Sequence, residues 1–112
     1  ILPDQVASSG DGVWAPFLGR PAYTPTLTAS LQHKTGAAAF FVAAERLSWG
    51  RGYHLHVFPV LDDLPANKAE AAIRINQGVE AVVRRFPAQY LWSYNRHKRP
   101  GGAPPPDSPA AG

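Results

Sequence analysis

The sequence contains no cysteine among its 112 residues. This absence excludes disulfide bonds, thiolate metal sites and a cysteine nucleophile, and it is compatible with a reducing compartment. Long apolar runs are also missing, since no stretch approaches the about 20 apolar residues that a membrane-spanning helix needs. No secretory signal pattern is present either. We therefore expect no part of this sequence to cross a membrane.

Acidic residues become scarce toward the end of the chain. Residues 1–83 contain six Lys and Arg against seven Asp and Glu, or −1, whereas residues 84–112 contain five against one, or +4. A basic end suits phosphates on a nucleic acid, on a lipid headgroup or on a phosphorylated substrate. A solvated end that only aids solubility explains the charge equally well.

The composition predicts one domain followed by a short tail. With 45% hydrophobic and 17% charged residues, the body is typical of a globular protein. We assign residues 1–100 to the domain. Residues 101–112 are rich in Pro, Gly and Ala and have no periodic apolar positions, which predicts a disordered tail. The chain starts at Ile1, and its apolar residues run directly into Pro3 and Asp4, which indicates a fragment of a longer protein.

The first half of the chain predicts a strand, a helix and a second strand. Residues 13–19 are typical of a short strand interrupted by Pro16. Thr24 as the N-cap and Pro25 at the first helical position predict a helix that ends near Gly36. Residues 37–47 form a nearly continuous apolar run, which is typical of a strand covered on both faces.

The second half predicts the other strand of a hairpin and a long helix. Residues 53–61 begin with Tyr53, Leu55 and Val57 alternating with His54, His56 and Phe58, as in a half-exposed strand. Asn67 and Glu70 have the spacing of a capping box, and Pro87 ends the helix. Apolar residues with a helical period lie between them, at Ala72, Ile75, Val79, Val82 and Phe86. The order of elements predicts an α/β or mixed α+β fold.

Two histidines make a metal site conceivable. His54 and His56 point to the same face of the predicted strand, and Glu45 lies across the hairpin. Two histidines supply at most half of a tetrahedral shell, and such a pair is usually just solvated, so we expect no metal. No serine has the Gly-x-Ser-x-Gly setting of an activated nucleophile, and no glycine-containing stretch matches a phosphate-binding loop.

Two residues near the start of the chain are candidates for a binding site. Asp4 follows an apolar stretch and a proline, where α/β proteins tend to place their sites, although an Asx turn explains it as well. Arg20 lies in a glycine- and proline-containing loop just ahead of the predicted helix. An arginine fork and free backbone N–H groups together make an anion site.

The end of the predicted domain combines aromatic and cationic residues. Tyr90, Trp92 and Tyr94 alternate and are expected to share one extended face, with Trp92 capping the core. The cations Arg96, Lys98 and Arg99 then remain available for solvent or for an anion. Interfacial aromatics beside cations are typical of a protein that rests on an anionic membrane.

Three separated blocks resemble the C-terminal part of the lipid A biosynthesis lauroyl and myristoyl acyltransferases. They read LPDQVASSGDGVWAPFLGRPAYT, TGAAAFFVAAERLSWGRGYHLHV and FPAQYLWSYNRHKRP. The resemblance implies the C-terminal part of a glycerolipid acyltransferase-like layered domain, with a mixed sheet flanked by helices. It also implies transfer of a fatty acyl chain from acyl carrier protein to a hydroxyl of a phosphorylated glucosamine lipid. The implied place is the cytoplasmic face of the inner membrane, with no cofactor, no metal and no nucleic-acid partner.

The catalytic pair of the resembling family is a histidine with an acidic residue five positions later. The histidine removes the proton of the attacking hydroxyl, and the carboxylate orients the ring. Five residues beyond the four histidines of this chain lie Ala38, Pro59, Leu61 and Gly102, so the sequence contains no such pair. In the family the pair lies upstream of the PDQ block. The resemblance therefore implies a fragment that is inactive by itself.

The resemblance also implies a set of substrate-binding residues. Asp4 falls in the block that resembles the Pro-Glu-Gly motif of the wider fold, which implies a role near the acceptor. The remaining positions match the GRPA-T loop, the end of the buried strand and the cationic ending, and they are Arg20, Thr24, Arg46, Arg96 and Lys98. The alternative is a non-enzymatic module that binds an anionic membrane surface or a nucleic acid through its basic end.

Overall fold

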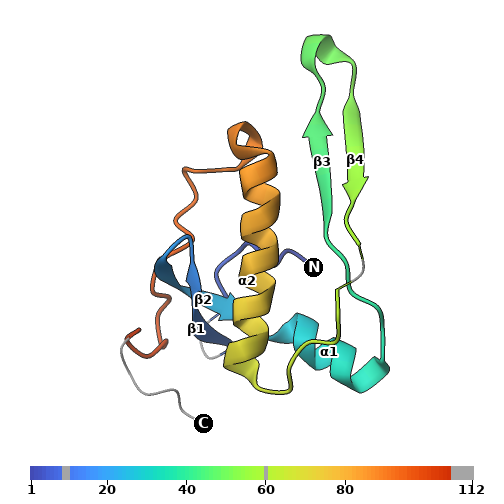
Figure 1. The fold of residues 1–112 in the computed structure, drawn as a ribbon. Coiled ribbons are helices and arrows are strands. Elements are labelled where there is room, and N and C mark those ends of the chain that lie inside the picture. The colour runs from blue at the N-terminus through green and yellow to red at the C-terminus, as the bar shows by residue number, and fades with distance from the viewer. Residues whose placement is uncertain (9–10, 60, 107–112) are drawn as a thin grey trace.

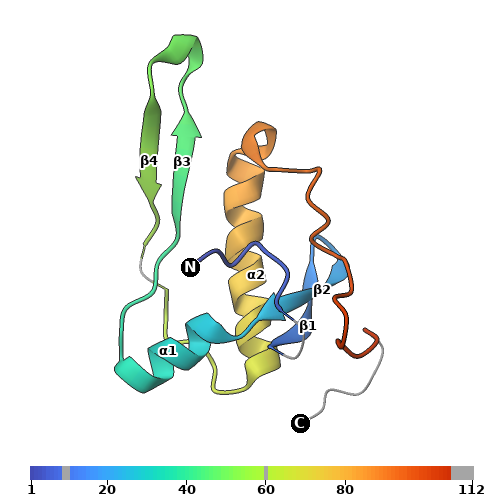
Figure 2. The ribbon, with the colours of Figure 1, turned by 180° about the vertical axis from the view of Figure 1, so that it is seen from behind.

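The structure, a computed structural model, describes residues 1–8, 11–59 and 61–106. Four strands form two separate antiparallel sheets of two strands each. Figures 1 and 2 show helix α2 across the β1–β2 sheet, whereas the β3–β4 hairpin projects away beside α2. In chain order, the elements are β1 (Gly12–Phe17), β2 (Arg20–Pro25), α1 (Leu27–Thr35), β3 (Val42–Arg46), β4 (Tyr53–Val57) and α2 (Lys68–Arg85), with short 3-10 helices at Ser48–Gly50 and Pro87–Gln89. A mixed α/β fold is confirmed, but the described residues contain no single mixed sheet flanked by helices.

A tight turn joins the first two strands. Leu18 and Gly19 both have positive φ angles, of 50° and 78°, as in the type I′ turns that suit the twist of a hairpin. Phe17 pairs with Arg20 across this turn, and the Leu18 N–H donates a hydrogen bond of 2.6 Å to Glu80 on α2. The strand predicted at residues 13–19 is confirmed up to Phe17, but Leu18 and Gly19 belong to the turn, and the partner strand was not predicted.

Helix α1 begins later than the sequence predicted. Thr24 and Pro25 belong to β2, and the residue that precedes the helix is Thr26. The prediction of Thr24 as N-cap is wrong because the β1–β2 turn draws this segment into a hairpin. The predicted end is confirmed, since Gly36 has a φ of 69° and its N–H donates to the carbonyl of Gln32.

The apolar run at residues 37–47 is not a strand covered on both faces. Only its second half, Val42–Arg46, is a strand, and within the described part of the chain it pairs with β4 alone. Phe40 is 50% exposed and Val42 is 49% exposed. The hairpin is confirmed, with its second strand at Tyr53–Val57. Most residues of the two strands are exposed, because the end of α2 covers only a small part of this two-stranded sheet.

Helix α2 forms as the sequence predicted. The Asn67 side chain accepts a hydrogen bond of 3.0 Å from the Glu70 N–H at its start, and Arg84 lies 3.5 Å from Glu80. Its inner face contacts two groups of buried residues, one with Phe17 and Ala22 and the other with Ala29 and Leu64. The helix residues buried there are Ala71, Ala72, Ile75, Asn76, Val79 and Val83.

The segment after α2 returns along the β1–β2 sheet. Trp92 does not cap the core as predicted, since it is 58% exposed and its ring N–H bonds only the nearby Pro87 carbonyl. Part of the predicted tail is packed against the domain. Ala103 is 3% exposed, and the Trp14 ring N–H donates a hydrogen bond of 2.8 Å to the carbonyl of Pro104. Residues 107–112 of the predicted tail lie outside the described residues.

Candidate functional site

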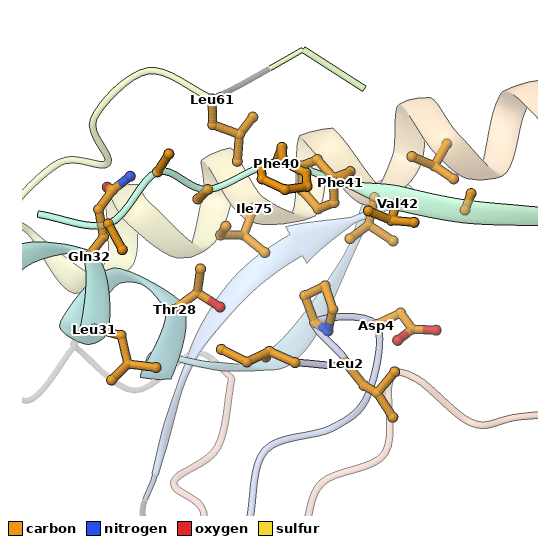
Figure 3. Close-up of a pocket in the computed structure, with 18 of the residues that line it drawn as sticks. Leu2, Asp4, Thr28, Leu31, Gln32, Phe40, Phe41, Val42, Leu61 and Ile75 are labelled. Atoms are coloured by element: carbon orange, nitrogen blue, oxygen red, sulfur yellow. The ribbon is translucent and has the colours of Figure 1, made fainter. Parts of the chain in front are cut away.

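An apolar pocket of about 670 Å³ lies between the N-terminal segment, α1, residues 37–43 and α2. This volume is within the range of sites that enclose small molecules and cofactors. Figure 3 shows Asp4 at the end of the pocket that lies opposite Leu31 and Gln32. Among the described lining residues, Asp4 has the one charged side chain. The lining is otherwise dominated by carbon, including Leu2, Leu31, Phe40, Phe41, Leu61, Ile75 and Val79.

The polar groups at the far end of the pocket are already engaged. The side-chain oxygen of Gln32 accepts a hydrogen bond of 2.7 Å from the Leu64 N–H. His33 lies on the same helix, and its Nε2 is 2.7 Å from the Leu64 carbonyl. These two contacts tie α1 to the segment before α2. That end of the pocket is therefore held in shape and presents mainly carbon to a ligand.

Tyr90 connects the pocket to a buried charge. Its ring lines the pocket, and its hydroxyl is buried with no hydrogen-bond partner among the described residues. Burial raises the pKa of Tyr90, and the negative charge of Asp4 raises it further. Burial also lowers the pKa of Arg96, while the charges of Tyr90, Tyr94 and Asp4 act in the opposite direction. The charge of Asp4 therefore acts on both Tyr90 and Arg96.

Arg96 is buried rather than available at the surface. Only 2% of the residue is exposed. Its guanidinium donates hydrogen bonds to the Tyr23 carbonyl at 3.0 Å, the Thr24 hydroxyl at 3.1 Å and the Asn76 side-chain oxygen at 3.3 Å. The sequence-based expectation that Arg96 faces solvent or an anion is therefore wrong, because its partners come from inside the β2–α2 interface.

The structure brings together only some of the predicted substrate-binding residues. Thr24 and Arg96 share a hydrogen bond, and the charge of Asp4 acts on Arg96. Lys98 is exposed beside this group, with its Nζ 5.9 Å from the centre of the Tyr94 ring. Arg20 is exposed at the start of β2, and Arg46 is exposed at the end of β3 on the projecting hairpin.

One cluster of potential metal ligands lies outside the pocket, on the β3–β4 hairpin. Glu45, His54 and His56 each offer one ligand atom, and these atoms lie within 4.8 Å of one another. The Glu45 carboxylate is 2.7 Å from Nε2 of His56. Strand pairing thus brings Glu45, which the sequence places across the hairpin, close to the two histidines.

No helix in the described part of the chain is both long and apolar enough to span a bilayer.

Residues 1–99 match the family model described as bacterial lipid A biosynthesis acyltransferase. The chain belongs to this family. Three relatives extend the match, and each has 33% identity to this chain. A lipid A biosynthesis palmitoleoyltransferase of Escherichia coli K12 aligns over 104 residues, as does a lipid A biosynthesis acyltransferase of Shigella flexneri.

The third relative is a lipid A biosynthesis lauroyltransferase of Escherichia coli K12, which aligns over 105 residues. Each alignment covers 91% of this chain but 34% of the relative. The chain thus spans about a third of the length of these acyltransferases. Family membership, which the three sequence blocks predicted, is therefore confirmed.

Sequence reasoning missed two residues of the buried polar group. Asn76 lies on the inner face of α2, where its amide donates to the Pro16 carbonyl and to the Thr24 hydroxyl. It sits one position after Ile75 in the predicted apolar stripe, which is the signal that could have revealed it. Tyr90 was expected to share one extended face with Trp92, but the Tyr90 hydroxyl is buried whereas Trp92 is exposed, and alternation alone cannot separate the two.

Proposed function

We propose that the protein containing these residues transfers a fatty acyl chain from acyl carrier protein to a hydroxyl of a lipid A precursor. In such a transfer the hydroxyl oxygen attacks the thioester carbonyl and a base takes the hydroxyl proton. The carrier thiolate then leaves and is protonated as the ester forms. The observation that carries the proposal is the apolar pocket with a single carboxylate, in a chain whose family acts on such lipids.

Under this proposal the pocket encloses acyl chain and Asp4 binds the polar part of the acceptor. A hydrocarbon chain requires carbon surface, and the lining supplies it from the N-terminal segment, α1, residues 37–43 and α2. Asp4 is a partly exposed carboxylate at one end of that surface, where it can accept a hydrogen bond from an acceptor hydroxyl or amide. The acyl chain is thus buried next to the place where Asp4 binds the polar part of the acceptor.

In this proposal the exposed cations bind the phosphates of the acceptor. Arg20, Arg46 and Lys98 are exposed and can contact phosphate oxygens. Arg96 and Thr24 are positioning residues, since both are buried and joined to one another. The proton transfer is assigned to a histidine and acid pair in another part of the protein, because no histidine here has an acid five positions later.

The proposed place of action is the cytoplasmic face of the inner membrane. Leu91 is 67% exposed and Trp92 is 58% exposed, and Lys98 and Arg99 follow in the same segment. Apolar side chains beside cations favour the interface of an anionic bilayer, where each cation contributes about 1 kcal/mol. The alternative, a non-enzymatic module bound to membrane or nucleic acid, has less support because burial of Arg96 removes one of its cations.

The test is an acyl-transfer assay with the gene product that contains this chain, a carrier-linked acyl thioester and a lipid A precursor. Asp4→Asn should lower kcat/KM by about 10–100-fold, because a hydrogen bond to a charged group contributes about 1.5–3 kcal/mol. Lys98→Ala should raise the KM for the acceptor. Asp63→Asn is the matched control, since Asp63 is an exposed carboxylate outside the pocket lining. The absence of transfer by the wild-type protein, with salt-sensitive binding to RNA, would support the alternative instead.

A further inference from the structure

The β3–β4 hairpin gathers three ligand-type side chains on one face. Glu45 pairs directly with His54, and the next pair on the same face is Ala43 with His56. Residues opposite each other in an antiparallel pair lie on one face, and so do residues two apart on a strand. Figure 1 shows this hairpin projecting beyond the β1–β2 sheet. Strand pairing therefore holds the carboxylate and both imidazoles together.

We propose that Glu45, His54 and His56 bind one Zn²⁺ ion, with the fourth coordination position open to solvent. Their ligand atoms lie within 4.8 Å of one another, and those of Glu45 and His56 are 2.7 Å apart. Zinc bonds of about 2.0–2.2 Å in a tetrahedron place the ligand atoms about 3.4 Å from one another. The contact between Glu45 and His56 is shorter than this value, so these side chains must rotate apart for an ion to enter the cluster.

The two imidazoles differ in what they already contact. His56 is 15% exposed at its side chain and meets the Glu45 carboxylate. His54 is exposed and forms no hydrogen bond within the described part of the chain, and its ring stacks on that of His56 at 4.2 Å with planes 15° apart. The ion pair with Glu45 gives a partner to His56 but not to His54. A metal ion would give a partner to both imidazoles, and to bind it the two rings must tilt from their stacked arrangement.

Contacts around the cluster support it from outside. The ring of Phe86, just after α2, packs on that of His56 with centres 4.8 Å apart. The Arg46 N–H donates a hydrogen bond of 2.6 Å to the Gln89 side chain, which anchors the strand beside Glu45. Such surroundings restrict ligand rotation, which favours metal affinity. The ligands are thus held from the α2 side and open on the other.

The neighbouring arginines form no ion pair with the Glu45 carboxylate among the described residues. Arg46 pairs with Tyr53, one step from the Glu45–His54 pair, and this places it on the opposite face of the hairpin. Its guanidinium lies 5.9 Å from the centre of the Tyr53 ring. Arg85 lies over the rings of Phe58 and Phe86. Among the described residues, the one ion pair of Glu45 is with His56.

The ligand chemistry selects the class of metal. Two imidazoles and one carboxylate are a set typical of zinc and other first-row transition ions, whereas Mg²⁺ and Ca²⁺ prefer oxygen ligands. An ion bound here would link β3 to β4. An isolated two-stranded hairpin is marginally stable in water, so this link would stabilise an element that little else covers. The inference goes beyond acyl transfer and does not depend on it.

The test uses the untagged 112-residue chain, freed of metal with a chelator and then titrated with Zn²⁺ against a chromophoric competitor. One equivalent should bind. Loss of a group that supports a metal ligand typically lowers metal affinity by about 10–100-fold. Glu45→Gln, His54→Gln and His56→Gln each remove a ligand itself, so each should weaken Zn²⁺ binding by at least this factor. His33→Gln is the matched control, because it removes an exposed imidazole on α1 and leaves the three ligands intact. It should bind Zn²⁺ as the wild type does.

Two further measurements separate a metal site from a structural ion pair. The Co²⁺ form should show visible absorption of tetrahedral intensity, and Zn²⁺ should slow amide hydrogen exchange in residues 42–57. His54→Gln is the decisive variant, because His54 has no hydrogen bond to lose among the described residues and its loss should leave the hairpin folded. Failure of the wild-type chain to bind Zn²⁺, or equal binding by the wild type and His54→Gln, would overturn the proposal.

Discussion

The guanidinium of Arg96 donates a hydrogen bond of 3.1 Å to the hydroxyl of Thr24, across 72 positions of the sequence. Both residues are buried, with exposed fractions of 2% and 0%. Thr24 also accepts from the amide of Asn76 and donates to the Ala22 carbonyl. The bond therefore closes a polar group that joins β2, α2 and the segment after α2. A cation that sequence alone places at the surface is a central connection of the fold.

Arg96→Met should destabilise the chain markedly. The substitution leaves the Asn76 side-chain oxygen without its buried donor, whereas the Tyr23 carbonyl keeps the hydrogen bond from the Ala7 N–H. Leaving a buried acceptor unsatisfied costs about 1–3 kcal/mol in the free energy of unfolding. Urea denaturation measures the change. Lys98→Met is the control, since Lys98 is exposed, and it should change the free energy of unfolding by no more than about 0.5 kcal/mol.

A double-mutant cycle identifies the bond itself. Thr24→Val removes the hydroxyl while keeping the shape, and its effect should be smaller in the Arg96→Met background than in the wild type. Residues in direct contact show coupling energies of about 0.5–3 kcal/mol. Additive effects of the two substitutions would contradict the assignment of Thr24 and Arg96 to one buried group.

The sequence predicted best those elements whose pattern is local. The α2 helix has its cap, its apolar stripe and its stop within 20 residues of sequence, so Asn67, Ile75 and Pro87 were enough to define it. The β2 strand was missed because its turn depends on the positive φ of Leu18, and leucine is not a residue that predicts such a turn. The β3–β4 hairpin, by contrast, was predicted because a short turn containing Gly50 and Gly52 separates its two strands.

The site was harder to predict than the fold because its residues meet only through tertiary contacts. Nothing near Arg96 in the sequence shows that Tyr23 and Asn76 supply acceptors for it. Charge counting therefore placed it with Lys98, which is exposed. Burial of the apolar run at residues 37–47 was also overestimated, because its composition does not show how many layers cover it.

Gly78→Ala should lower stability although alanine favours helices. Gly78 lies in the middle of α2, and a Cβ atom there would overlap the ring of Phe41. Overpacking costs about 1–3 kcal/mol, which exceeds the about 1 kcal/mol that alanine gains over glycine in a helix. Thermal and urea melts should both show the loss. Combining the change with Phe41→Leu should recover part of it, and a stabilised single variant would refute the close contact.

Tyr90→Phe and Tyr94→Phe form a matched pair with opposite expected effects. The Tyr94 hydroxyl accepts a hydrogen bond of 2.9 Å from the Val6 N–H, so its removal should cost about 0.5–1.5 kcal/mol. The Tyr90 hydroxyl is buried without a partner among the described residues. Tyr90→Phe should therefore leave the free energy of unfolding at pH 7 unchanged or raise it. A large loss for Tyr90→Phe would contradict this.

Tyr90 should also shape the alkaline limit of stability. Burial, together with the charge of Asp4, raises the pKa of its phenol above the ordinary value. A raised pKa in the folded state means that ionisation favours the unfolded chain, so stability is intact below about pH 10 and falls as the pH rises further. Urea midpoints measured between neutral and alkaline pH should fall less in Tyr90→Phe than in the wild type. Parallel curves would exclude this contribution.

Residues 101–106 should contribute to stability although their composition is that of a tail. Ala103 is 3% exposed beside Ala7 and Tyr23, and the Pro104 carbonyl accepts the ring N–H of Trp14. We expect a chain ending at Pro106 to be more stable than one ending at Pro100 by about 1–2 kcal/mol, mainly from the Trp14 hydrogen bond and one small buried side chain, with a further hydrogen bond from Arg99 to the Ala103 carbonyl. Because both variants lack residues 107–112, the difference in their urea midpoints isolates this segment. Trp14→Phe should remove part of the difference, and equal midpoints for the two truncated chains would show that the contact adds nothing.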